Sequence, residues 1–214
     1  MRKRLLVLGA IPILLAACGA KTATRTVTVA SAPPARQSQL ATLAGVAERI
    51  YVEESKGTVD QAPLRALERD RALVRAAARG NATTVKAEAG RLMATATHVT
   101  GIRILRGGRT LADASGSFVV GGKLRPLRGA PGVQAEISIQ DILGYASLVH
   151  RVTGDEVVVR GSSGHTLASP AAATGARLPS SGRVQVAGRT YQAISFMEPG
   201  WAGERLTVWL LQPA

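Results

Sequence analysis

Serine and histidine are the residues of this chain whose types could support hydrolysis. The segment Ser162-Ser163-Gly164-His165 places two hydroxyls close to an imidazole. A serine hydrolase also needs an orienting acid, and the Gly-x-Ser-x-Gly elbow that often presents the nucleophile does not occur in the sequence. Ser and Gly are also residues that a tight turn favours for backbone reasons. We therefore interpret the segment as a hairpin turn, and predict no enzymatic activity and no catalytic residues.

The histidines do not predict a metal site. His98, His150 and His165 each stand alone, whereas zinc ligands usually occur in pairs at short spacing, such as i and i+4 on a helix. The glycine pairs Gly107-Gly108 and Gly121-Gly122 lack the Lys-Ser/Thr of a phosphate-binding loop, so they indicate turns. We expect no metal and no other cofactor.

A small-molecule pocket needs apolar walls and a few convergent polar groups. Our candidate ligand-binding residues, which interrupt apolar segments, are Tyr145, Arg160, Tyr191 and Ser195. A two-residue turn at Gly188-Arg189 would pair Val186 with Tyr191 and place Tyr191 and Ser195 on one face of a sheet. Buried hydroxyls there need partners, which a ligand could supply. The alternative is that both tyrosines are core aromatics with satisfied hydroxyls, and that Arg160 is an edge charge.

Hydrophobic periodicity predicts that residues 37–100 are helical. Apolar residues recur at helical spacing from Leu40 to Tyr51, and Gly57 would end this first helix. Asp60 could cap a second helix that ends at Gly80-Asn81. A third amphipathic segment covers residues 83–98. These helices present apolar faces that must cover something.

After Gly101 the period falls to two, which predicts a sheet-rich region over residues 101–214. A hairpin is expected over residues 102–113, a strand over 133–139, and a helix capped by Asp141 and ended by Gly154. Further strands are expected at residues 157–160, 166–168, 184–187, 191–196 and 206–211. Tight hairpins imply an antiparallel sheet with one face covered by helices, so the predicted fold class is α+β.

Two of these hairpins resemble each other in sequence. Residues 102–115 read IRILRGGRTLADAS, and residues 157–170 read VVVRGSSGHTLASP. Each combines a strand, a turn and a second strand. Because two hairpins of similar length produce such likeness by chance, the sequence alone gives little support for an internal duplication.

The N-terminus resembles a bacterial lipoprotein signal. A basic start, Met1-Arg2-Lys3-Arg4, precedes an apolar run over residues 5–15 that is too short to span a bilayer. Leu15-Ala16-Ala17-Cys18 then resembles a lipobox. The resemblance implies a signal peptide over residues 1–17, acylation of Cys18 with palmitate among its lipids, and anchoring to the extracytoplasmic face of the cell membrane. Residues 18–36, rich in Ala, Thr and Ser, are predicted to be a flexible tether.

Composition excludes some functions. The formal net charge is +13, and most of the 27 Lys and Arg residues are dispersed arginines. With 2 Trp, 3 Tyr and 2 Phe the chain offers no platform on which bases could stack, so nucleic acid is not an expected partner. Anionic lipids, envelope polymers or an acidic ligand remain compatible with the charge. Cys18 is the single cysteine, so no disulfide is expected.

Residues 37–214, predicted to form a single domain, resemble an extracytoplasmic Cache domain, the PAS-like sensor module of bacterial receptors. The resemblance rests on the hairpin at Ile102 to Asp113, on Ser138-Ile139-Gln140-Asp141 with Gly144-Tyr145 and Arg151-Val152-Thr153-Gly154, and on Gly188-Arg189-Thr190-Tyr191, Ser195-Phe196 and Leu206 to Leu211. It implies an antiparallel sheet with a long N-terminal helix packed along it. It also implies a small molecule bound between the sheet and its covering elements.

The resemblance predicts a membrane-anchored sensor lipoprotein that binds a small solute, for which an anion is one option. Family members usually signal through a transmembrane helix, and this chain has only Gln212-Pro213-Ala214 after its last predicted strand. A receptor or kinase partner would therefore have to carry the signal. The alternative is a structural or accessory envelope lipoprotein that docks onto a receptor or a cell-envelope polymer through an exposed apolar patch.

Overall fold

Five α-helices and two antiparallel sheets make up the described part of the chain. A computed structural model describes residues 34–56, 61–96 and 98–214. The helices are α1 (Pro34–Lys56), α2 (Gln61–Arg69), α3 (Arg71–Arg79), α4 (Ala82–Thr95) and α5 (Ile142–Thr153). The strands are β1 (Gly101–Arg106), β2 (Arg109–Ser115), β3 (Arg125–Pro126), β4 (Val133–Ser138), β5 (Glu156–Arg160), β6 (Thr166–Ala168), β7 (Ser181–Val186), β8 (Arg189–Pro199) and β9 (Arg205–Pro213). The predicted α+β class is confirmed, but two sheets stand where the sequence suggested one.

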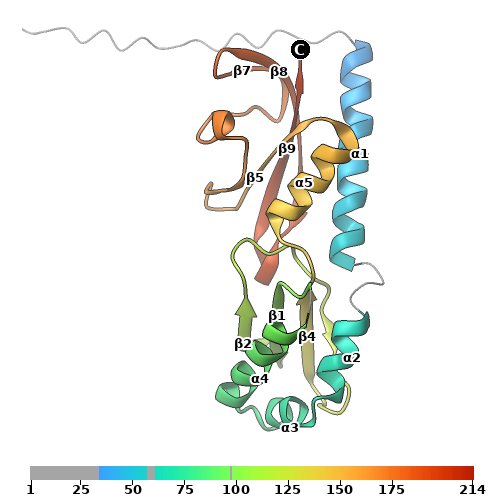
Figure 1. Ribbon diagram of the computed structural model, residues 1–214, viewed down its shortest axis with the longest axis vertical. Coiled ribbons are helices and arrows are strands. Elements are labelled where there is room, and N and C mark those ends of the chain that lie inside the picture. The colour runs from blue at the N-terminus through green and yellow to red at the C-terminus, as the bar shows by residue number, and fades with distance from the viewer. Residues whose placement is uncertain (1–33, 57–60, 97) are drawn as a thin grey trace, which may run out of the picture.

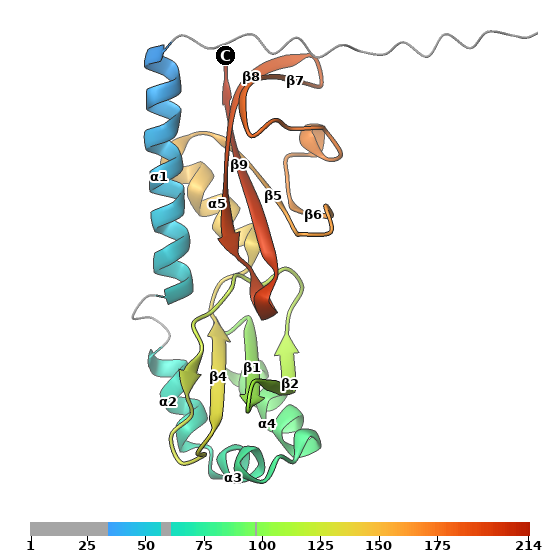
Figure 2. The same ribbon diagram turned by 180° about the vertical axis from the view of Figure 1, so that it is seen from behind.

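The two sheets form two units placed end to end (Figures 1 and 2). The four-stranded unit consists of α2, α3, α4 and the sheet β2-β1-β4-β3. The five-stranded unit consists of α1, α5 and the sheet β6-β5-β9-β8-β7. Helices α2 to α4 cover one face of the four-stranded sheet, where their apolar residues form one core with Ile102, Ile104, Ala135 and Ile137.

Helix α1 runs along the five-stranded unit, as the amphipathic pattern predicts. Its buried residues are Leu40, Ala44, Ala47 and Tyr51, spaced by three or four as one helical face requires. The helix begins at Pro34, so the end of the predicted tether is helical; Cys18 and the rest of the tether lie outside the described residues. None of the described helices is long and apolar enough to cross a membrane.

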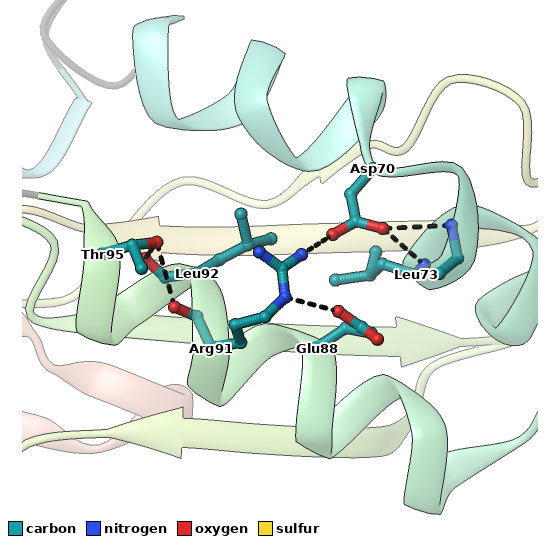
Figure 3. Close-up of polar contacts among 7 residues, drawn as sticks. Asp70, Leu73, Glu88, Arg91, Leu92 and Thr95 are labelled. Atoms are coloured by element: carbon teal, nitrogen blue, oxygen red, sulfur yellow. Dashed lines mark hydrogen bonds and ion pairs between the residues drawn. The ribbon is translucent and has the colours of Figure 1, made fainter.

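The single helix expected before Gly80 is wrong, because Asp70 divides it into α2 and α3. The Asp70 carboxylate accepts hydrogen bonds from the backbone N–H groups of Ala72 and Leu73, both at 3.0 Å, which caps a new helix. Its other oxygen pairs with Arg91 of α4, and Arg91 also binds Glu88 at 2.8 Å (Figure 3). One side chain therefore starts α3 and connects it to α4.

The five-stranded sheet has a covered face on each side. Helices α1 and α5 pack on one face, over residues that include Val157, Val208 and Leu210. Asp141 caps α5 through the Gly144 N–H at 2.6 Å, as predicted. The opposite face carries Val184, Val186, Tyr191 and Ala193, and the segment from Ala173 to Leu178 covers it.

The hairpin β7–β8 differs in register from the prediction. Val186 pairs with Arg189 and Val184 pairs with Tyr191, so the turn residues are Ala187 and Gly188 rather than Gly188 and Arg189. Ala187 and Gly188 both have positive φ, of 48° and 80°, the conformation that a tight two-residue hairpin turn requires. The register shifts by two residues, which preserves side-chain alternation, so the predicted shared face is still correct.

The two hairpins of similar sequence occupy equivalent places in the two sheets. In each, the first strand lies inside the sheet and the second strand forms its edge. Both contain the tripeptide Thr-Leu-Ala, and both have a β-bulge at its leucine: Leu111 lies between the pairs Ile104–Ala112 and Leu105–Thr110, and Leu167 between Val159–Ala168 and Arg160–Thr166. A shared bulge position is more specific than hairpin length, so it favours an internal repeat.

Tyr51, near the C-terminal end of α1, connects the two units. Its hydroxyl donates a hydrogen bond to the Pro199 carbonyl at 2.6 Å and accepts one from the Gly121 N–H at 3.2 Å. Its ring packs edge-on against Tyr145, with centroids 5.2 Å apart. Burial raises the pKa of the Tyr51 hydroxyl well above its ordinary value, so the group stays a neutral donor.

Trp201, in the turn between β8 and β9, makes a second connection. Its indole N–H lies 3.2 Å from both carboxylate oxygens of Asp113 on β2. The Arg103 guanidinium lies over the indole ring, 5.9 Å from its centroid, and also pairs with Glu136. Because Asp113, Arg103 and Glu136 are neighbours across the four-stranded sheet, Trp201 docks one unit onto the other.

We expect Tyr51→Phe to lower the free energy of unfolding by about 1–3 kcal/mol, since it leaves the buried Gly121 N–H without an acceptor. The control is Tyr145→Phe. It removes only the hydrogen bond to the Ala47 carbonyl at 3.1 Å, which also accepts a bond within α1, so it should cost about 0.5–1.5 kcal/mol. Urea unfolding of both variants measures the difference. Equal losses would contradict the connecting role of Tyr51.

We expect Asp70→Ala to cost about 1–2 kcal/mol through loss of the α3 cap. Arg91→Ala removes the ion pairs with Asp70 and Glu88, but because the arginine side chain is 55% exposed it should cost less than about 1 kcal/mol. Asp70→Asn retains the capping oxygen but loses the negative charge, so its loss of stability should lie between those of Arg91→Ala and Asp70→Ala. Chemical denaturation of the three variants tests the order, and an Arg91 variant as unstable as Asp70→Ala would show that the ion pair dominates.

Candidate functional site

The two predicted tyrosines lie in different cores. Tyr145 is buried between α1 and α5, and its hydroxyl is satisfied by the Ala47 carbonyl. Burial raises the pKa of that hydroxyl above its ordinary value. Tyr191 lies on the opposite face of the five-stranded sheet, in the core under the Ala173 to Leu178 segment. The structure therefore places both as core aromatics and does not bring them together.

Arg160 holds this covering segment in place, whereas Ser195 only lies opposite Trp209, which contacts the chain just after the segment. The Arg160 guanidinium donates a hydrogen bond to the Ala176 carbonyl at 2.6 Å and lies 5.3 Å from the ring centroid of Trp209. Trp209, which pairs with Ser195, donates to the Pro179 carbonyl at 3.0 Å. Arg160 is therefore more than an edge charge, because it fastens a segment over the sheet.

The candidate site is a hollow that none of those four residues lines. It lies in the four-stranded unit, between α2 and the short edge strand β3, and has a volume of about 460 Å³. This volume is within the usual range for small-molecule sites. We call it the arginine pocket; its lining residues are Leu64, Arg65, Glu68, Arg125, Pro126 and Arg128.

The same tripeptide, Pro-Leu-Arg, builds both walls of the arginine pocket. Leu64 of α2 and Leu127 after β3 are 8% and 2% exposed and anchor their backbones in the core of the four-stranded unit. Arg65 and Arg128, the residues that follow them, are exposed at the rim. Each buried leucine therefore sets the position of the arginine beside it.

Charge in the arginine pocket is unbalanced. Three of its lining residues are arginines, and one, Glu68, is acidic. Glu68 faces Arg128 with 3.8 Å between Oε1 and Nε, but the Arg128 side chain is 88% exposed, so this pair is weak. The Nε of Arg125 is buried and has no hydrogen-bond partner. A buried guanidinium N–H without an acceptor is costly, and this one belongs to a residue that lines the arginine pocket.

Sequence reasoning missed the arginine pocket because dispersed arginines carry no spacing signal. Arg65 and Arg125 are distant in sequence, and only the packing of α2 beside β4 and its edge strand brings them together (Figure 2). The repeated Pro-Leu-Arg at residues 63–65 and 126–128 is the signal that could have indicated it.

The segment Ser162-Ser163-Gly164-His165 forms the expected turn, and Glu204 lies near its histidine. Ser163 Oγ contacts His165 Nδ1, and His165 Nε2 lies 4.0 Å from Glu204 Oε1. That distance exceeds a hydrogen bond, so the carboxylate does not orient the imidazole as in a catalytic triad. Within residues 34–56, 61–96 and 98–214, no three His, Cys, Asp or Glu side chains gather closely enough to hold a metal ion.

Comparison of the chain with models of protein families, with curated proteins and with solved structures finds no match.

Proposed function

We propose that this protein is a non-enzymatic, lipid-anchored extracytoplasmic binding protein that holds a small anion in the arginine pocket and acts through a partner protein. The observation that carries the proposal is the buried, unpartnered Nε of Arg125 beside a hollow rimmed by Arg65 and Arg128. Guanidinium groups bind carboxylates and phosphates with paired hydrogen bonds, so such anions are the ligand class that fits.

The arrangement of the elements supports this role. A long helix packed along an antiparallel sheet is what the Cache resemblance implies. Helix α1 begins at the end of the molecule where the C-terminus lies, and the four-stranded unit lies at the other end (Figure 1). A lipid on Cys18 would therefore present the arginine pocket away from the membrane, to solutes and to a partner.

We expect Arg125→Gln to weaken binding of citrate or inorganic phosphate at least about tenfold, because one charge-assisted hydrogen bond contributes about 1.5–3 kcal/mol. Isothermal titration calorimetry of the full chain with each probe measures this. Wild-type affinity should fall as salt rises, since the rim arginines are screened.

The matched control is Arg151→Gln, an equal loss of charge at an exposed residue of α5. It should leave affinity unchanged. If Arg151→Gln weakens binding as much as Arg125→Gln does, the anions bind the general positive charge and the pocket has no special role. Absence of saturable binding by the wild-type chain would contradict the proposal outright.

We expect Cys18→Ser to abolish labelling by palmitate and to move the protein from the membrane to the soluble fraction of a bacterial host. The thiol is the group that the lipobox resemblance assigns to acylation, and several inserted acyl chains suffice for anchoring. Detergent phase partitioning provides a second measurement. Unchanged membrane association of Cys18→Ser would show that another segment anchors the chain, and would leave the anion proposal unaffected.

A further inference from the structure

A second hollow lies at the junction of the two units and shares no residue with the arginine pocket. Its volume is about 320 Å³. It is lined by residues of the segment after β2, of β6 and the turn before it, and of the turn between β8 and β9. These residues include Phe118, Leu167, Trp201, His165 and Glu204. We call it the junction pocket.

Two aromatic residues, Trp201 and Phe118, contribute to its wall. Trp201 is fixed by its hydrogen bonds to Asp113, and Arg103 already lies over its ring. Phe118 contributes a second ring, and its side chain is 44% exposed, so it is open to a ligand. The faces of such rings carry negative potential and attract cations.

A carboxylate lies beside these rings. Glu204 Oε1 and His165 Cε1 both rest against Gly161, and a Cβ at that position would clash with them unless their side chains moved. Gly161 therefore gives Glu204 and His165 room against the sheet. Of the residues that line the junction pocket, Glu204 is the one acidic residue, and none is a lysine or an arginine.

Backbone strain concentrates at the same place. Phe118 and Ala202 both line the junction pocket, and both are non-glycine residues in the left-handed region, with φ of 60° and 55°. The Phe118 carbonyl accepts a hydrogen bond from the Ile142 N–H at 2.7 Å, and the Gly200 N–H donates to the Glu204 carbonyl at 2.6 Å. These contacts hold both strained residues, and such strain is commonly retained at binding sites.

We propose that the junction pocket binds a small organic cation, of the alkylammonium class, with its charge against Glu204 and its alkyl groups against Trp201 and Phe118. Aromatic rings combined with one carboxylate are the chemistry that recognises quaternary ammonium groups. The pocket is separate from the anion site, and the proposal does not depend on that function. The positive charge of the whole chain is screened at physiological ionic strength, so a contact of this kind persists there.

The test is calorimetric titration of the full chain with choline and with its neutral isostere 3,3-dimethylbutan-1-ol, in about 0.15 M salt. Both probes have the same shape, and only choline is charged. We expect choline to bind saturably and at least tenfold more tightly than the alcohol. Glu204→Gln should reduce choline affinity at least tenfold and leave the alcohol unaffected. Glu53→Gln, the same change at an exposed residue of α1, should alter neither.

Each other outcome overturns the proposal. Equal binding of both probes would mean that the hollow is merely apolar, and no saturable choline binding would mean that it is not a cation site. Retained choline affinity in folded Glu204→Gln would place the cation elsewhere. Should that variant fail to fold, Phe118→Ala tests the location instead, because it removes an exposed ring of the junction pocket: choline affinity should fall, and unchanged affinity would place the cation elsewhere.

Discussion

The hydroxyl of Tyr51 is the contact on which the arrangement of the two units depends. It is fully buried, and its donor and acceptor roles are both used, one toward each unit. Gly121 must be glycine for this contact to exist, because a Cβ there would lie 2.5 Å from the Pro199 carbonyl oxygen and 2.8 Å from that of Gly200. A side chain at that position would push the two units apart. Helix α1 thus ends where the two sheets meet and fixes their separation.

The junction pocket lies close to the Tyr51 contact, whereas the arginine pocket lies within the four-stranded unit. The arginine pocket is built by α2, β3 and the residues after β3, all within the four-stranded unit. The junction pocket uses the β8–β9 turn, which begins next to Pro199 and contains Trp201. A ligand in the junction pocket would therefore act on the contacts that join the units, whereas an anion in the arginine pocket would act on one unit alone. Two ligands of opposite charge could bind without competing for a site.

Sequence patterns among neighbouring residues predicted most of the helices and strands, but they predicted neither the arginine pocket nor the junction pocket. The helices, the hairpins and the Asp141 cap follow from periodicity and capping chemistry, which are properties of neighbouring residues. The division at Asp70 was missed because the apolar period continues across it; the break depends on the hydrogen bonds that the Asp70 side chain accepts from the first residues of α3. The sequence left two interpretations of Tyr145 and Tyr191, ligand contacts or core aromatics. They are core aromatics, because α1 and the Ala173 to Leu178 segment cover them on opposite faces of one sheet. Such covering depends on contacts that are distant in sequence.

The repeated hairpin indicates where function is to be sought. If the two sheets are copies of one element, residues that the copies share maintain the fold, as the bulged Leu111 and Leu167 do. Residues that differ between the copies make the contacts that one copy has and the other lacks. Asp113 follows Thr-Leu-Ala in the first copy and holds Trp201, whereas Ser169 at the same place in the second bonds only locally to the Pro170 carbonyl. The contact that joins the units is thus particular to the first copy, although the junction pocket beside it is also lined by the shared Leu167 of the second.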